Sequence, residues 1–466
     1  MMREPMYMDM TYIHEATRYY YISRDNQQVC STTELSESSF PVTDESRVYS
    51  EDYRQPHNIS NIERQLNVYY LKVHKTGSST FRNILQRLIL NHNLSTPIFR
   101  QQHTYPSRNM LHKLVPIKTI FDKRKQLAST EEAIRQNQCN IICVHTVFNK
   151  TQINTIMPKD TLLVASIREP FSQFKSSFNF WKLSEKYQIK KSTDPILEYF
   201  RNLDKYEKLL PGSFYNPIAK KENVLLSYSK NYMAYEYGFD LDRIHNETYV
   251  NGHLEFINST FKSVMILEKY DESLLLLRKN THWTFEELLY VKQRDRKYSF
   301  KAKNYTSDIV EMHRGMSPID YRIYDMFLER HNKLVHFAGS RFQDELKAFR
   351  SVLEKMHDFC LPLLNKIQRT KKLHQIIDIA ERDIVINATE FSDSFTLSGA
   401  KCALLSMGEL FLRTAVKLWQ YPSICQTKST WKYAGLSQKR FSAFCGSAKK
   451  MIFNISYDFY KVQGVW

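Results

Sequence analysis

The segment LKVHKTGSSTF, residues 71–81, decides the fold because it joins a strand-like run to a helical one. The run at residues 68–73 is short, aromatic and β-branched, as is typical of a strand. After the loop, residues 79–90 carry apolar side chains at the spacing of one helix face. Strand, tight loop and helix form one βα unit.

Further strand-like runs alternate with helical patterns along the chain. The run at residues 161–167 is unbroken and apolar, as in a strand buried within a parallel sheet. This alternation predicts an α/β fold with a mostly parallel sheet and a helical C-terminal part. The other predicted strands are 140–144 and 263–267, and the helices are one that follows Pro170, 271–278, 285–291, 321–338 and 342–356.

The composition limits the possible partners. The chain has 466 residues, with 66 Lys and Arg against 49 Asp and Glu, which gives a net charge of +17. This charge favours an anionic partner such as a nucleotide, a sulfated glycan, nucleic acid or an acidic membrane. The basic residues are spread along the chain and carry no zinc-finger or RNA-binding signature, which argues against nucleic acid.

Three regions follow from the pattern. Residues 1–66 are polar and predict a disordered lead. Residues 67–365 hold the α/β domain, and residues 366–466 form a basic, helical C-terminal extension whose role the sequence leaves open. No window of about eighteen uncharged apolar residues is present, so the chain as written neither enters nor spans a membrane.

Cysteines and glycosylation sequons bear on the compartment. The seven cysteines form no Cys-x-x-Cys pair and suggest no zinc site, and their pairing cannot be deduced. An excess of Asn-x-Ser/Thr sequons favours a lumenal or secreted history, with chance as the alternative. The sequons lie at Asn58, Asn93, Asn149, Asn246, Asn258, Asn304, Asn387 and Asn454.

The loop of the first βα unit has the composition of an anion-binding site. Gly77 can adopt a backbone conformation closed to other residues, and the amides at the start of the next helix can then face a phosphate or sulfate. Lys75 supplies a positive charge close by. The alternative is an ordinary turn in which Ser79 caps the helix. The hydroxyl donors of the loop are Thr76, Ser78, Ser79 and Thr80.

A second segment, SIREPFSQFKSSF at residues 166–178, follows the most apolar predicted strand. Arg168 lies at the carboxyl end of that strand, where open α/β sheets bind ligands. Ser176 follows on the next helix, so the two side chains could hold a second phosphate. The alternative is a structural arginine paired with Glu169 or Asp160.

Taken together, the two segments resemble sulfotransferases that use 3′-phosphoadenosine-5′-phosphosulfate (PAPS), most closely the galactose 3-O-sulfotransferases. The stretches CVHTVFN (143–149), NYMAYEYGFD (231–240) and residues 264–290 also resemble that family. The resemblance covers about residues 68–360. It implies that residues 67–365 form a sulfotransferase domain with a P-loop-like, three-layer α/β/α sandwich.

The resemblance also implies a set of site residues. Arg168 and Ser176 would hold the 3′-phosphate of PAPS, and Lys75 would also stabilise the leaving phosphate during transfer. His145, at the end of a predicted strand, is the expected catalytic base, with His74 as the other candidate. No metal is expected. The 5′-phosphosulfate would be held by Lys75, Thr76, Gly77, Ser78, Ser79 and Thr80.

The implied reaction moves a sulfuryl group from PAPS to the 3-hydroxyl of a β-galactose on a glycolipid or glycoprotein glycan. The alternatives are a glycosaminoglycan (uronyl or hexosaminyl) O-sulfotransferase and a catalytically silent glycan-binding relative. A nucleotide kinase or triphosphatase fits poorly, because the Walker order of residues is missing. Candidates for the acceptor pocket, with solvated helix faces as the alternative, are Glu268, Asp271, Glu272, Arg278, His282 and Trp283.

The resemblance further implies a Golgi location and membrane association. Members of that family are typically type II membrane proteins of the Golgi with an amino-terminal signal anchor. No such anchor is visible in the sequence as written. The location is therefore an expectation from the resemblance alone.

Overall fold

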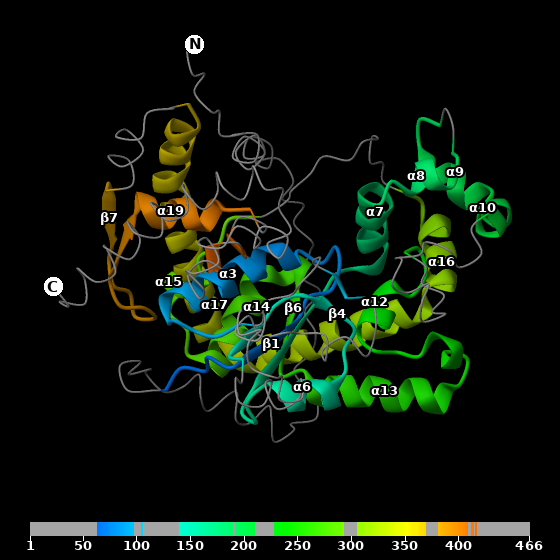
Figure 1. The fold of residues 1–466 in the computed structure, drawn as a ribbon, viewed down its shortest axis with the longest axis horizontal. Helices are drawn as coiled ribbons and strands as arrows, with labels where there is room; N and C mark the ends of the chain where they lie inside the picture. Colours follow the sequence, from blue (N-terminus) through cyan, green and yellow to red (C-terminus); the bar gives the residue numbers. More distant parts are fainter. Residues whose placement is uncertain are drawn as a thin grey trace, which may run out of the picture.

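The computed structural model describes residues 63–96, 104–105, 139–189, 192–209, 228–292, 305–369, 381–408, 412–413 and 415–416. Its centre is a sheet of four parallel strands in the order β3-β1-β5-β6 (Figure 1). The parallel sheet confirms the predicted α/β class. The strands are β1 (Val68–Leu71), β3 (Ile141–Ile142), β5 (Leu162–Ile167) and β6 (Ser263–Ile266).

The strand predicted at residues 140–144 is shorter than expected. Only β3 pairs with the central sheet, and the chain then forms β4 (His145–Thr146). β4 pairs in parallel with β2 (Thr104–Tyr105). His145 therefore lies within a second, two-stranded sheet rather than just after a strand of the first.

Helices cover both faces of the central sheet, as the alternation of β1 requires. Val68 and Tyr70 point into one core, and Tyr69 and Leu71 point into the other. In Figure 1, α3 lies above the sheet and α6 and α13 lie below it. This is the predicted three-layer arrangement. The first core contains α3 (Ser78–Asn91), α14 (Tyr270–Thr281) and α15 (Phe285–Leu288), and the second contains α6 (Lys150–Ile156), α12 (Tyr232–Glu236) and α13 (Glu247–Thr260).

A separate group of helices packs around an aromatic core beyond the end of the sheet. Phe171, Phe174 and Phe178 of α7 lie in this core with Tyr199 and Phe200. The group stands at the right of Figure 1. Its members are α7 (Pro170–Phe180), α8 (Leu183–Lys186), α9 (Pro195–Arg201), α10 (Leu203–Leu209) and α16 (Ser307–Met316), and two short 3₁₀ helices lie elsewhere, η3 (Leu241–Arg243) and η4 (Leu267–Lys269).

The two helices predicted after residue 317 form one long element, α17 (Pro318–Arg369), interrupted at Gly339, where φ is 67°. Its first part packs in the second core and its later part in the first core. The boundary predicted at residue 365 falls inside α17. Among the described residues, no helix combines the length and apolar character needed to cross a membrane.

The chain after α17 contains strands that the sequence pattern does not predict. An antiparallel hairpin of β7 (Asp383–Ile386) and β8 (Phe395–Ser398) leads into α19 (Gly399–Ser406). A disulfide joins Cys360 of α17 to Cys402 of α19. The pairing left open by the sequence is thus given for these two cysteines. The predicted lead up to residue 62 and the extension beyond residue 416 lie outside the described residues.

Candidate active site

The loop between β1 and α3 has the backbone geometry of an anion-binding turn. Lys75 has a φ of 65° and Gly77 a φ of 71°, both in the left-handed region. A Cβ on Gly77 would lie 2.4 Å from Leu267 Cδ1, so the loop approaches η4 closely. Gly77 is also the N-cap of α3 and offers no side chain to the first amides of the helix. The alternative in which Ser79 caps α3 is therefore not what the structure has.

Of the two cationic residues predicted for the site, Lys75 belongs to this loop and Arg168 contacts it from the carboxyl end of β5. The Lys75 ammonium sits 4.1 Å from the centre of the Phe180 ring. Arg168 donates from Nη1 to the carbonyl of Lys75 (3.2 Å), and its Nε lies 3.9 Å from Glu268 Oε1. Burial raises the pKa of Glu268. Arg168, at the carboxyl end of β5, thus contacts the backbone of the loop that carries Lys75.

Glu169 does not pair with Arg168, because its carboxylate caps the helix that follows. Its carboxylate accepts from the amides of Phe171 (2.8 Å) and Ser172 (2.7 Å) and so caps α7. The other proposed partner, Asp160, accepts from Asn67 at 2.9 Å. Neither alternative pairing of Arg168 is formed in the described part of the chain.

The serine and threonine residues predicted to bind the donor phosphates differ in burial and in hydrogen bonding. Thr76 is buried, donates to the Val73 carbonyl (2.9 Å) and lies 2.7 Å from the Ser166 hydroxyl, so it ties the loop to β5. Ser79 and Ser176 are half-buried. Within the described ranges, no hydrogen bond joins the Ser176 side chain to the loop. Ser78 and Thr80 are buried in the first turn of α3.

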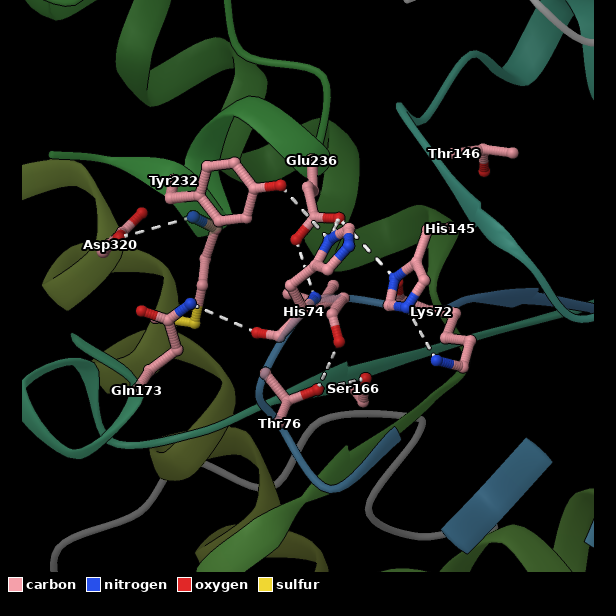
Figure 2. A network of polar contacts seen from close by, with 12 residues as sticks. Lys72, His74, Thr76, His145, Thr146, Ser166, Gln173, Tyr232, Glu236 and Asp320 are labelled. Atoms are coloured by element: carbon pink, nitrogen blue, oxygen red, sulfur yellow. Dashed lines mark hydrogen bonds and ion pairs between the residues drawn. The ribbon is translucent and has the colours of Figure 1, made fainter. Parts of the chain in front are cut away.

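His74 is held by a carboxylate from another part of the chain (Figure 2). Its Nδ1 lies 2.5 Å from Glu236 Oε1, and its backbone amide donates to Glu236 Oε2 (2.7 Å). The Tyr232 hydroxyl lies 3.3 Å from the same Nδ1, and Gln173 donates to the His74 carbonyl (3.1 Å). An ionised carboxylate can only accept, so the Nδ1–H of His74 donates to Glu236. No hydrogen bond engages Nε2 in the part of the chain that the structure describes.

His145 stacks on His74 but is held differently. The two rings lie 3.5 Å apart, with 12° between their planes. The Nδ1 of His145 donates to the Lys72 carbonyl (2.5 Å), and its Nε2 accepts from the Lys72 ammonium (2.7 Å). Lys72 is 1% exposed. Both ring nitrogens of His145 thus contact Lys72, and its Nδ1 also lies 4.0 Å from Glu236 Oε1, as drawn in Figure 2.

His74, His145 and Glu236 are also the kind of group that can bind a metal ion. Their potential ligand atoms lie within 4.8 Å of one another, and all three residues are buried. However, the Lys72 ammonium touches His145 and would repel a cation. The donors therefore fit proton transfer better than metal binding.

The helix that carries Tyr232 and Glu236 is fixed by α17. Asp320 accepts from the amides of Ala234 (2.7 Å) and Met233 (3.4 Å) at the start of α12. In return, the Asn231 side chain accepts from the amides of Ile319 (3.0 Å) and Asp320 (3.4 Å) at the start of α17. The two helix termini cap each other, with Asp320 fully enclosed. Burial raises the pKa of the Asp320 carboxyl to about 7.

The structure places most of the candidate acceptor residues away from this network. Trp283 is 0% exposed and donates from its indole to the Gln65 carbonyl (2.9 Å). Arg278 is buried in an ion pair with Glu345. Glu272 pairs with His331 at 3.1 Å. Among the described contacts of these candidates, only those of Glu268 reach a predicted site residue, Arg168.

The sequence alone does not single out Lys72, Tyr232, Glu236 or Asp320. One signal for Glu236 is present, because it is the only charged residue in the aromatic and apolar run 232–239. A charge in such a run is buried when the run folds into a core, and buried charges are paired. The partner, 162 residues earlier, is not visible in any local pattern.

Comparison with known proteins finds a family that matches most of the chain. A family profile described as galactose-3-O-sulfotransferase matches residues 22–382. Galactose-3-O-sulfotransferase 2 of Homo sapiens is 31% identical over 302 residues, which cover 63% of this chain and 68% of that protein. The Mus musculus protein of the same name is 28% identical over 298 residues, covering 63% and 70%. Galactosylceramide sulfotransferase of Homo sapiens is 26% identical over 307 residues, covering 63% and 64%.

No solved structure matches the chain. The family profile, however, extends over well more than half of the sequence and includes the loop after β1, both histidines and Glu236. The chain belongs to the galactose-3-O-sulfotransferase family of enzymes.

Proposed function

We propose that the protein transfers a sulfuryl group from PAPS to the 3-hydroxyl of a β-galactose on a glycolipid or glycoprotein glycan. The observation that carries the proposal is a buried histidine, held by a carboxylate, at the start of a loop with left-handed backbone at Lys75 and Gly77, which supports an anion-binding role. A proton acceptor and a sulfate site must be neighbours for this chemistry. Family membership supports a galactose acceptor.

The donor would bind across the loop and the carboxyl end of β5. The amides at the start of α3, with Lys75, Ser78, Ser79 and Thr80, would hold the 5′-phosphosulfate. Arg168, already against the loop, would hold the 3′-phosphate together with Ser176. Thr76 would act indirectly, because its hydroxyl is used to hold the loop on Ser166.

Transfer would proceed in line. The acceptor hydroxyl gives its proton to a base, its oxygen bonds to sulfur, and the bond from sulfur to the bridging phosphate oxygen breaks. The electron pair of that bond leaves with the nucleotide, as 3′-phosphoadenosine 5′-phosphate. Lys75 would neutralise the charge on the departing phosphate, which is the main electrostatic contribution that such a site can make.

We assign the base to His74 rather than to His145. Glu236 holds the Nδ1 proton of His74, which leaves Nε2 to accept the proton of the acceptor and stabilises the imidazolium that forms. His145 has both nitrogens bonded to Lys72. Its role would be to support His74 by stacking and to position Lys72.

The test is an acceptor screen with labelled PAPS and the full-length protein. We expect transfer to galactosylceramide, lactose-type or Galβ1-3GalNAc-type glycans, and little to desulfated glycosaminoglycans. Lys75→Ala should lower kcat/KM at least about 10²-fold. The control is Lys333→Ala, a half-exposed lysine on α17.

Other outcomes of the screen would select the alternatives. Transfer only to glycosaminoglycans would indicate a uronyl or hexosaminyl O-sulfotransferase. Glycan binding without transfer to any acceptor would indicate a catalytically silent relative. Full activity of Lys75→Ala would refute the role given to this lysine.

We also propose that the protein works in the Golgi lumen, in association with the membrane. The Cys360–Cys402 disulfide supports an oxidising compartment, because disulfides are rare where thiols are kept reduced. The sequon at Asn387 is exposed and could carry a glycan. Light microscopy of the tagged protein with a Golgi marker, and its sensitivity to glycosidase, test this location.

A further inference from the structure

Three aromatic rings lie together next to the candidate base. The Trp181 and Tyr228 rings stack with 4.0 Å between centroids and 27° between planes. Tyr232 lies 5.2 Å from Trp181 and 5.1 Å from Tyr228. The His74 ring lies 5.5 Å from both Trp181 and Tyr232. An aromatic surface is thus continuous with the histidine.

The position of Trp181 in the chain connects this surface to the donor segment. Trp181 is the C-cap of α7, the helix that begins just after Arg168. The first turns of α7 also supply Gln173, which donates to the His74 carbonyl. One helix therefore runs from the expected 3′-phosphate site, past the base, to the aromatic rings.

Trp283 and Trp181 differ in exposure and in hydrogen bonding, and this difference distinguishes a structural tryptophan from one that can bind a ligand. Trp283 is 0% exposed and its indole N–H is bonded to a carbonyl, as expected of a core tryptophan. Trp181 is half-buried. In the described part of the chain its indole N–H makes no hydrogen bond. Tyr228 is half-buried as well, with the Lys186 ammonium 5.6 Å from its ring centroid, so both stacked residues keep some exposed surface.

We propose that Trp181 and Tyr228 form the wall of the acceptor site against which the galactose ring packs. A pyranose has an apolar face of C–H groups that packs on an aromatic ring, and its hydroxyls can accept from an indole N–H. A sugar on this wall has its hydroxyl groups within reach of His74. This inference rests on the proposed function and adds the residues that recognise the acceptor.

The first test compares Trp181→Ala, Trp181→Phe and Tyr228→Ala with the wild type in the full-length protein. Lactose serves as acceptor, and PAPS binding is measured separately by calorimetry. We expect Trp181→Ala to raise the KM for lactose by about tenfold or more while the Kd for PAPS changes less than about twofold. Trp181→Phe should recover most of the affinity for lactose. The control is Phe256→Ala, an aromatic residue that is 41% exposed on α13.

A second measurement tests lactose binding at this aromatic wall independently of catalysis. Lactose should change the tryptophan fluorescence of the wild type, and this change should be lost in Trp181→Phe. An unchanged KM for lactose in Trp181→Ala, or an equal loss of lactose and PAPS affinity, would overturn the proposal. If the wild type transfers sulfate to no galactoside, the proposed function fails. The fluorescence titration then still decides whether the wall binds galactose.

Discussion

At the scale of single residues, the position and the tautomer of His74 depend on Glu236. The carboxylate bonds to both the ring and the backbone amide of the histidine. Glu236→Gln keeps an oxygen acceptor but removes the charge that stabilises a protonated His74. We expect kcat to fall by about 10²-fold or more with PAPS binding unchanged. Steady-state kinetics and calorimetry measure the two effects.

The control for this substitution is Glu247→Gln. Glu247 is 71% exposed and pairs with Arg322 on the surface. Because solvent screens an exposed charge, removing it should not affect the histidine. If kcat of Glu236→Gln stays within about twofold of the wild type, His74 does not need the carboxylate and another base acts.

Gly77 gives a second prediction at this scale. Its φ of 71° disfavours a side chain, and a Cβ at this position would lie only 2.4 Å from Leu267. We expect Gly77→Ala to lower the free energy of unfolding by about 1–3 kcal/mol and to weaken PAPS binding, because the loop must shift. Urea unfolding and calorimetry test this.

Gly252→Ala is the matched control for Gly77→Ala. Gly252 lies within α13 and has open space around its Cβ position. Alanine is the better helix former, so this substitution should stabilise the protein by up to about 1 kcal/mol. Equal behaviour of the two variants would contradict the special role of the loop.

The local part of the site was within reach of the sequence, and the distant part was not. Lys75, Gly77 and Arg168 stand next to strand ends, where periodicity and turn chemistry indicate a ligand loop. Glu236 and Lys72 depend on contacts between segments far apart in the chain. Such contacts follow from packing and leave no periodic signal in either segment.

At the scale of elements, α12 owes its position to α17. Asp320 receives the amides at the start of α12, and burial raises the pKa of its carboxyl to about 7. The nearby Glu236 acts in the same direction. The unfolded chain releases this proton near its ordinary value of about 3.9, whereas the folded protein holds it until about pH 7. The stabilising contribution is therefore complete below about pH 4 and is lost as the pH rises to about 7.

Asp320→Asn should remove this pH dependence. Asparagine stays neutral and keeps an oxygen for the Ala234 amide. The free energy of unfolding should therefore fall less steeply with rising pH than in the wild type, and the difference in slope should correspond to one titrating proton. Activity should be largely retained. In Asp320→Ala the cap is lost, and we expect kcat to fall because α12 carries Glu236. Urea unfolding at several pH values between about 4 and 8 measures the slope. An unchanged slope in Asp320→Asn would show that this carboxyl does not titrate in that range.

Strands and helices were predictable to different extents. β5 and β6 are apolar runs followed by helices, and each lies within one or two residues of its predicted range. β7 and β8 have only four residues each, and most of β7 is not buried. Their stability comes from Ile386 and Leu397 packing in the first core rather than from their own pattern. A short, half-exposed hairpin of this kind cannot be separated from a loop by periodicity.

At the scale of the whole molecule, the segment after α17 packs in the first core, together with α3 and the central sheet. The apolar cluster that contains Phe81 of α3 also contains four residues of this segment, Ile386, Phe391, Leu397 and Leu405. Asn83 of α3 donates to the Leu404 carbonyl at 3.1 Å. The disulfide adds a covalent link over 42 residues of sequence separation, which stabilises by about 2–4 kcal/mol. The orange hairpin and α19 in Figure 1 lie against α3 and α17 accordingly.

A chain that ends at residue 365 should therefore fail to fold, although it contains every predicted donor-binding and catalytic residue. Removing the hairpin and α19 exposes the apolar surface of α3 and α17 and leaves Cys360 without its partner. Each large apolar side chain lost from a core costs about 1.5–3 kcal/mol of burial, which together exceeds the usual stability of a domain. A chain that ends at residue 416 keeps the packing of the hairpin and α19 and should unfold cooperatively at the temperature at which the full-length protein unfolds. Thermal unfolding followed by circular dichroism compares the three chains, and a cooperative transition in the shortest one at the temperature of the full-length protein would contradict this role of the C-terminal segment.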